Sequence, residues 1–259
     1  MNVTVLPTKE IQGDPAQWQA RIDLAAAHRL AVKDGLNEGI FNHFTLAVPN
    51  TDDRYYQIPF GLHWSEISAS SFMEVSYNGE LLSGKGVIER SGYCIHAPMH
   101  RLSKEAACVL HTHMPFASAL TRLKDQRILP VGQTELGVSI QTAYDDHYAG
   151  PAFDPEEGER LLEVLGDKTI LLMANHGAVT IGRTVADAYD RLYYLERVAQ
   201  VQLYAMWTGQ PLHVLSKKVI KETLAGFKSA PIYDGRSNAE HHFEALKRML
   251  DREQPDYKE

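Results

Sequence analysis

The stretch Cys108-Val109-Leu110-His111-Thr112-His113-Met114-Pro115 decides how this chain is interpreted. An apolar run ends there in a His-x-His pair. If the run is a β-strand, its side chains alternate between faces, so His111 and His113 point the same way with about 7 Å between their Cα atoms. Two polar rings on one face need partners. The pattern therefore favours a pair of metal ligands over two unrelated core histidines.

A second apolar run with the same kind of ending lies far downstream. Residues 169–173 are typical of a buried strand, and Ala174-Asn175-His176-Gly177 follows them. Three neutral imidazoles around a divalent ion leave an open coordination position, which is typical of catalytic rather than structural sites. We therefore predict a metal site formed by His111, His113 and His176.

Composition limits the alternatives. The chain has 259 residues, 44% of them hydrophobic and 23% charged, which is an ordinary globular mix with a sizeable core. The formal net charge is -7 and basic residues form no block, so nucleic acid and anionic membranes are not expected partners. No apolar stretch approaches the roughly 18 residues of a membrane span. Two cysteines without a Cys-x-x-Cys pair, and no apparent signal peptide, indicate a cytoplasmic protein.

The order of expected elements indicates helices around a central sheet. Asp14-Pro15 predicts a helix start, residues 44–48 and 55–59 a pair of strands, and Asn78-Gly79 the turn of a hairpin. Helices are expected at 91–102, from Thr184 to about Trp207, and at about 241–250. We expect an N-terminal arm over 1–13, one domain over 14–259 with a helical tail from about 215, and frayed residues at 251–259.

Several motifs in this order resemble the class II aldolase/adducin family. They are Phe41-Asn42-His43, the segment 60–67, Ile95-His96-Ala97, His111-Thr112-His113, Asn175-His176-Gly177, the segment 182–188 and Leu195-Glu196. The resemblance covers roughly residues 18–210. It implies a three-layer αβα sandwich with a mostly antiparallel central sheet, and a homotetramer with the pocket near a subunit boundary. It also implies a divalent ion on the three histidines, zinc first, with Fe²⁺, Mn²⁺ or Co²⁺ as alternatives.

The resemblance implies a lyase of the aldolase type that acts on a small hydroxy-carbonyl compound. Cleaving a carbon–carbon bond next to a carbonyl leaves an ene-diolate, whose charge a divalent ion stabilises as a Lewis acid. The family's sugar-phosphate aldolases place an acid/base glutamate 19 residues before the first histidine of the pair, and Gly92 occupies that position here. Glu89 lies only three residues earlier, but His96 and the His-x-His pair fix the register. We therefore expect that glutamate to be absent, as in adducin-like members.

The resemblance also places a substrate pocket, formed by Asn42, His43, Gly61, Ser91 and Gly92. The family's Thr-Gly and Ser-Ser phosphate-binding pairs are not reproduced, so a sugar phosphate is not the expected substrate. His147 is a candidate acid/base. Tyr144 lies near the position from which family aldolases offer a tyrosine to a neighbouring subunit.

Other polar residues have simpler interpretations. His96 and His100 are spaced for a second chelate on a helix, although packing beneath the metal site is the stronger interpretation. His241 and His242 are expected in solvent, and Arg191 and Tyr194 on the surface or in an interface.

Two other functions stay open. The same three histidines accept Fe(II), which would suit an oxygenase or decarboxylase. The chain could instead be a non-catalytic, adducin-like binding or assembly module. A structural module has little need for three convergent imidazoles, so the lyase is ranked first.

Overall fold

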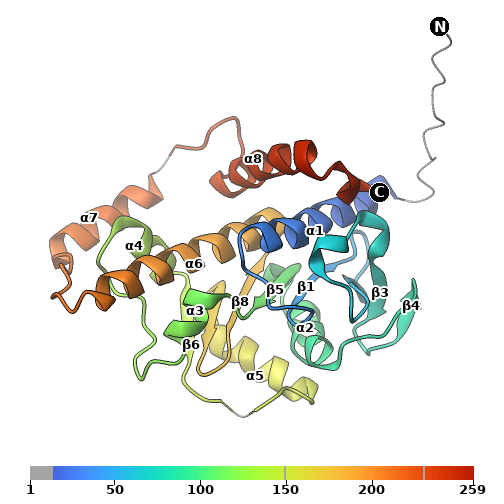
Figure 1. Cartoon of the computed structure of the whole chain (residues 1–259), viewed down its shortest axis with the longest axis horizontal. Coiled ribbons are helices and arrows are strands. Elements are labelled where there is room, and N and C mark those ends of the chain that lie inside the picture. Colours follow the sequence, from blue (N-terminus) through green and yellow to red (C-terminus); the bar gives the residue numbers. More distant parts are fainter. Residues whose placement is uncertain (1–13, 149, 230) are drawn as a thin grey trace, which may run out of the picture.

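A computed structural model describes residues 14–148, 150–229 and 231–259, and its centre is one eight-stranded sheet (Figure 1). The strand order is β4-β3-β2-β1-β5-β8-β7-β6. Every pairing between these strands is antiparallel except β6 with β7. The strands are β1 (His43–Ala47), β2 (Arg54–Gln57), β3 (Met73–Ser76), β4 (Leu81–Ser83), β5 (Cys108–Thr112), β6 (Thr142–Asp145), β7 (Ile170–Met173) and β8 (Ala178–Gly182).

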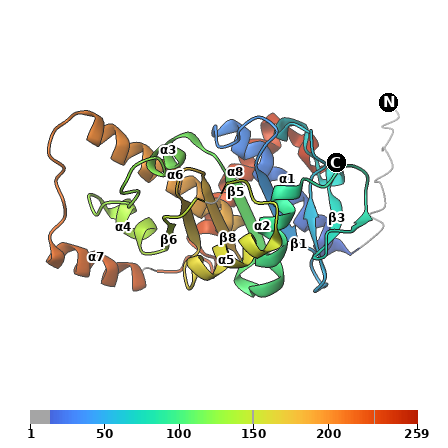
Figure 2. The same cartoon turned by 90° about the horizontal axis from the view of Figure 1, so that it is seen from below.

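Helices cover both faces of the sheet (Figures 1 and 2). One face carries α1 (Pro15–Lys33), α3 (Pro115–Leu120), α6 (Val185–Trp207) and α8 (Asn238–Glu253). The other face carries α2 (Arg90–Leu102) and α5 (Pro155–Leu165), while α4 (Gln133–Ser139) and α7 (Lys217–Lys228) lie at the β6 end. Short 3-10 turns are Trp64–Glu66, Ala69–Ser71, Lys104–Ala106 and Pro255–Lys258.

The apolar strands divide their side chains between two cores. In β5, Leu110 packs into the core beneath α1 and α6, whereas Val109 packs into the core beneath α2 and α5. In β7, Leu172 likewise packs into the first of these cores and Leu171 into the second. Both faces of these strands are therefore buried, which explains their nearly continuous apolar sequence. The predicted three-layer sandwich with a mostly antiparallel sheet is confirmed.

The expected local signals are present at several element ends. The Asp14 side chain accepts a hydrogen bond from the Ala16 N–H, and Thr184 accepts one from the Asp187 N–H. The hairpin between β3 and β4 turns at Asn78-Gly79, where Gly79 has a φ of 84°. The expected arm at 1–13 lies outside the described residues.

The expectation of a frayed C-terminus is wrong. Tyr257 is buried, and the Asp256 carboxylate lies 2.8 Å from a guanidinium nitrogen of the buried Arg29. The backbone carbonyl of Glu259 accepts a hydrogen bond from the Ser70 N–H. A buried guanidinium needs acceptors, and the terminal segment supplies them.

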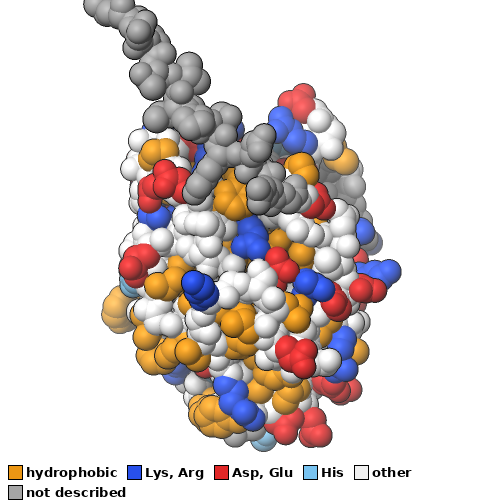
Figure 3. All heavy atoms as spheres, turned by 90° about the vertical axis from the view of Figure 1, so that its right-hand side faces the viewer, with side chains coloured by type: hydrophobic (Ala, Val, Ile, Leu, Met, Phe, Trp, Pro, Cys, Tyr) orange, Lys and Arg blue, Asp and Glu red, His pale blue; other side chains and the backbone are white. Residues whose placement is uncertain are grey.

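The visible surface is mixed in charge. On the face shown in Figure 3, basic, acidic and apolar side chains are interspersed. None of the described helices combines the length and apolar character that crossing a membrane requires.

Candidate metal centre and active site

The three predicted ligands come together. His111 and His113 lie at the end of β5, and His176 lies in the turn between β7 and β8. One ring nitrogen from each histidine lies within 4.8 Å of the others. The ring centroids of all three pairs are 4.9 Å apart. The strand β5 pairs with β8, and β7 leads into β8 through the turn that carries His176. These two strands therefore bring the three imidazoles to one point.

The Asn-His-Gly turn is shaped by backbone demands. Asn175 has a φ of 55°, a left-handed conformation that asparagine tolerates better than most residues. A Cβ at Gly177 would lie 2.5 Å from the carbonyl oxygen of Thr112 and 2.8 Å from the His113 ring. Only glycine lets this turn pack so closely against the end of β5.

Hydrogen bonds orient two of the rings. The Nδ1–H of His111 donates to the Ala178 carbonyl at 3.0 Å, and Nδ1 of His113 lies 2.5 Å from a Glu38 carboxylate oxygen. The Nε2 atoms of both rings are then left facing each other at 3.1 Å. Tetrahedral coordination at 2.0–2.1 Å would place two ligand nitrogens about 3.3 Å apart. The donor set and its supporting bonds therefore fit a divalent ion.

Electrostatics keep two of these imidazoles, His111 and His176, neutral. Burial, followed by the repulsion of His176 and His113, holds the pKa of His111 well below its usual value. Burial, followed by His113 and Arg122, lowers the pKa of His176 to about 4. The neutral ring is the form that binds a metal, so the site is prepared for one at neutral pH.

Two side chains hold the ligand segments in place. The buried Glu196 carboxylate accepts the N–H groups of Phe116 and Ala117, each at 2.8 Å, and so fixes the start of α3 just after His113. A guanidinium nitrogen of Arg122 donates to the His176 carbonyl at 2.6 Å. Glu196 of α6 and Arg122, which follows α3, thus position the segments that carry the candidate metal ligands.

A carboxylate–imidazole pair lies beside the histidines. Glu89 Oε2 is 2.8 Å from His43 Nε2, and the His43 ring stacks on His111 with centroids 5.6 Å apart. Burial alone would raise the pKa of Glu89, but the hydrogen bond and charge of His43, with the Gly92 N–H and the Ser91 hydroxyl, lower it to about 2. The carboxylate is therefore ionised at neutral pH.

Glu89 approaches the position left empty by Gly92. A Cβ at Gly92 would lie 3.3 Å from Glu89 Oε2 and 2.8 Å from the His43 ring. Glu89 is also the N-cap of α2 and accepts the Gly92 N–H at 2.6 Å. The sequence already showed this residue three positions before Gly92. Its pairing with His43, which begins β1, could not be predicted from the sequence.

The other predicted substrate residues do not all line the same cavity. Asn42 has a φ of 92°, and its Oδ1 accepts the N–H groups of Glu38 at 3.0 Å and His113 at 3.4 Å. A small cavity contains Asn42, His43, Phe60 and Glu89 in its wall. Gly61 lies next to it with a φ of 100°, and the Ser91 hydroxyl donates to Glu89 instead of facing the cavity.

The two predicted catalytic residues are separated. His147 shares a cavity wall with His176 and Tyr148, whose ring centroid is 6.3 Å from that of His176. Tyr144 instead accepts the Ile128 N–H with its hydroxyl at 3.1 Å and lies under the Arg127 guanidinium. Within this chain Tyr144 is not brought to the metal centre. Its predicted role toward a neighbouring subunit, like that of His147, stays a prediction.

His96 and His100 of α2 share a hydrogen-bond partner, Thr45, and do not form a second metal chelate. His96 Nδ1 and His100 Nε2 lie 2.7 and 2.8 Å from the same Thr45 hydroxyl, and all three residues are buried. The packing interpretation therefore holds for both. In the tail, His242 is not simply solvated, because its Nδ1 lies 2.8 Å from Asp190.

The chain belongs to the class II aldolase and adducin family, because the family model "Class II Aldolase and Adducin N-terminal domain" matches residues 22–203. A crystal structure of an aldolase II superfamily protein from Pseudomonas syringae is 33% identical, with a TM-score of 0.86 over 98% of this chain and all of that one. A Pseudomonas aeruginosa protein, whose name assigns it to the class 2 aldolases only provisionally, is 34% identical over 96% of each chain.

The family's two branches both appear among the similar proteins. Rat alpha-adducin is 29% identical over 95% of this chain, which spans 36% of the adducin's length. An L-fuculose 1-phosphate aldolase from Glaciozyma antarctica has a TM-score of 0.80 over 98% of this chain and 97% of its own. At 20% identity, that likeness shows the shared fold alone.

Proposed function

We propose that this protein is a divalent-metal-dependent lyase of the aldolase type that acts on a small hydroxy-carbonyl compound. The observation that carries the proposal is the convergence of three imidazoles beside the ionised Glu89 carboxylate, which pairs with His43. His111, His113 and His176 would hold the ion. When bound, the ion would supply Lewis-acid stabilisation for negative charge that develops on substrate oxygens.

The chain's own residues supply proton transfer beside that position. The Glu89 carboxylate is ionised and can accept a proton, and His43 holds it in place through Nε2. Positioned acid/base groups contribute about 10²–10⁴-fold to the rate of a proton transfer, and the low pKa of Glu89 places its contribution at the lower end of that range. Glu89 thereby takes the acid/base role for which the sequence offered His147 and Tyr144.

Orphaned polar atoms favour a polar substrate in the same place. Asn42 Nδ2 and His43 Nδ1 are buried and have no hydrogen-bond partner among the described residues. Buried polar groups are rarely left unpaired, so these two atoms are available to substrate oxygens. Asn42 and His43 line the small cavity together with Glu89, whose negative charge disfavours a phosphate there.

The similarity to alpha-adducin favours a second candidate, a binding or assembly module without catalysis. The two candidates differ in what the metal does. Loss of the metal abolishes a lyase, whereas an assembly module keeps its oligomeric state and its partners.

Metal analysis with a retro-aldol assay tests the proposal. Purified wild-type protein is expected to contain about one divalent ion per chain, and to cleave at least one member of a panel of hydroxy-carbonyl compounds, phosphorylated and not. His111→Ala is expected to lose both the ion and turnover, whereas His213→Ala, at an exposed histidine, retains both. A fully metal-loaded protein without turnover on the whole panel contradicts the lyase and supports the second candidate.

A further inference from the structure

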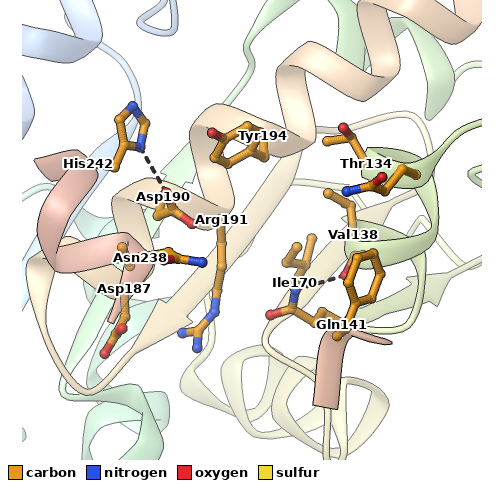
Figure 4. Close-up of a pocket in the computed structure, with 14 residues that line it drawn as sticks. Thr134, Val138, Gln141, Ile170, Asp187, Asp190, Arg191, Tyr194, Asn238 and His242 are labelled. Atoms are coloured by element: carbon orange, nitrogen blue, oxygen red, sulfur yellow. Dashed lines mark hydrogen bonds and ion pairs between the residues drawn. The ribbon is translucent and has the colours of Figure 1, made fainter. Parts of the chain in front are cut away.

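A separate cavity of about 390 Å³ lies at the opposite end of β7 from the metal centre. Ile170, which begins β7, lines this cavity, whereas His176 follows the other end of the strand. The walls come from α4, α6, α7 and the start of α8 (Figure 4). Its volume falls in the range of small-molecule sites, about 300–1,000 Å³.

One wall of this cavity is apolar. Val138 and Ile170 are buried, and the Phe227 ring of α7 lies over Gly137 of α4. A Cβ at Gly137 would be 3.6 Å from that ring, an ordinary contact distance, so the aromatic ring lies close against the helix backbone. This wall suits an aliphatic or aromatic group.

The facing wall carries separated charges of opposite sign. Asp187 and Arg191 are half-buried and lie one turn apart on α6, yet no ion pair joins either of them to an oppositely charged side chain among the described residues. Arg191 instead donates an N–H of its guanidinium group to the Ile181 carbonyl. Its remaining N–H groups are available to a ligand.

The neighbouring polar groups complete this wall. In Figure 4 the Asn238 amide is directed toward the Arg191 side chain, and Asp190 is already engaged by His242 at 2.8 Å. The cavity thus offers one available cationic group, one available anionic group and an amide. A phosphate there would face two carboxylates, and a simple amine would face the guanidinium.

We propose that this cavity binds a zwitterionic α-amino acid with an apolar side chain. Its carboxylate would accept hydrogen bonds from Arg191 and Asn238, and its ammonium group would pair with Asp187. Residues four apart on a helix have Cβ atoms about 5–6 Å apart, a spacing that the adjacent charges of an amino acid can bridge. The side chain would lie against Val138 and Phe227. This site is independent of the lyase proposal, because it shares no lining residue with the metal centre.

Isothermal titration calorimetry of the full-length protein tests the proposal with L-leucine and two analogues. Isocaproate lacks the ammonium group and isoamylamine lacks the carboxylate. We expect leucine to bind, and each analogue to bind about tenfold more weakly, because each loses one charge-assisted hydrogen-bonded pair. Phosphate alone and glycine, which lacks the apolar group, are expected to bind more weakly than leucine.

Two charge-removing variants assign the charges. Arg191→Gln should remove the advantage of leucine over isoamylamine, and Asp187→Asn its advantage over isocaproate. Arg183→Gln, at an exposed arginine near the start of α6, is the matched control and should leave binding unchanged. Thermal unfolding of each variant checks that it is folded. Phe227→Ala provides a second test, because it should weaken the binding of leucine but not that of glycine. The proposal is overturned if leucine does not bind or if leucine and both analogues bind equally. It is also overturned if Arg183→Gln changes leucine binding as much as Arg191→Gln or Asp187→Asn does.

Discussion

Replacing Glu89 by glutamine isolates the charge that the site depends on. Glu89 Oε2 accepts the Gly92 N–H at 2.6 Å and the Ser91 hydroxyl at 2.9 Å, and lies 2.8 Å from His43 Nε2. Glutamine keeps the length of the side chain and an oxygen acceptor for the helix cap. It removes the negative charge opposite His43 and the group proposed to accept a proton.

The expected loss of stability follows from the pKa. The pKa of Glu89 falls from 4.5 to about 2 in the folded protein, and its side chain is 22% exposed. That difference corresponds to on the order of 3 kcal/mol, present above pH 4.5 and lost as the pH falls toward 2, because the unfolded chain binds the proton first. Since glutamine still caps α2, we expect a loss of about 2 kcal/mol at pH 7.

Urea unfolding followed by circular dichroism measures this loss, and the retro-aldol assay measures the chemistry. The difference in free energy of unfolding between wild type and variant should decrease as the pH falls from 4.5 to 3. Turnover by the variant should be about 100-fold lower, with the metal content unchanged. Glu163→Gln, at an exposed glutamate of α5, is the control. A stability change below about 0.5 kcal/mol would refute the electrostatic argument. Undiminished turnover in a metal-loaded variant would refute the acid/base role.

Three further changes test the surroundings. Gly92→Ala should displace the His43 ring, which its Cβ would approach to 2.8 Å, and cost about 1–3 kcal/mol in urea unfolding; unchanged stability would contradict the close contact. Tyr257→Ala should cost about 3 kcal/mol, because the ring is buried, whereas a frayed terminus predicts no change. Burial lowers the pKa of His28 and His100 to about 4. The unfolded chain therefore protonates first, and stability should fall from pH 6.5 to 4 by on the order of 3 kcal/mol per residue; a flat profile of unfolding free energy against pH contradicts this.

The clustering of the three histidines could be predicted because its signal is local. The alternation of a strand places His111 and His113 on one side, and an apolar run before His176 indicates a similar strand end. The pairing of β5 with β8 then brings the ligands together, as the sandwich fold requires. Local caps and the Asn78-Gly79 turn were predicted for the same reason, since a few neighbouring residues determine them.

Elements that depend on distant contacts were not predicted. The short strand β6 pairs with β7 in parallel, and its mixed sequence has no alternation to reveal it. A helical tail from about 215 was expected, and α7 lies there, but its packing on α4 through Phe227 could not be predicted from the sequence. The ordered terminus depends on Arg29, which lies 227 residues before Asp256.

The absence of a carboxylate at position 92 does not mean that the site lacks one. Glycine at 92 leaves room for the His43 ring, since any Cβ there would overlap it, and His43 in turn pairs with Glu89, the N-cap of α2. The same carboxylate caps α2, so the helix start itself fixes the position of the charge. Gly92, His43 and Glu89 therefore act as one unit. Restoring an acid at position 92 alone would displace His43 and separate the pair, which predicts that such a change impairs this site.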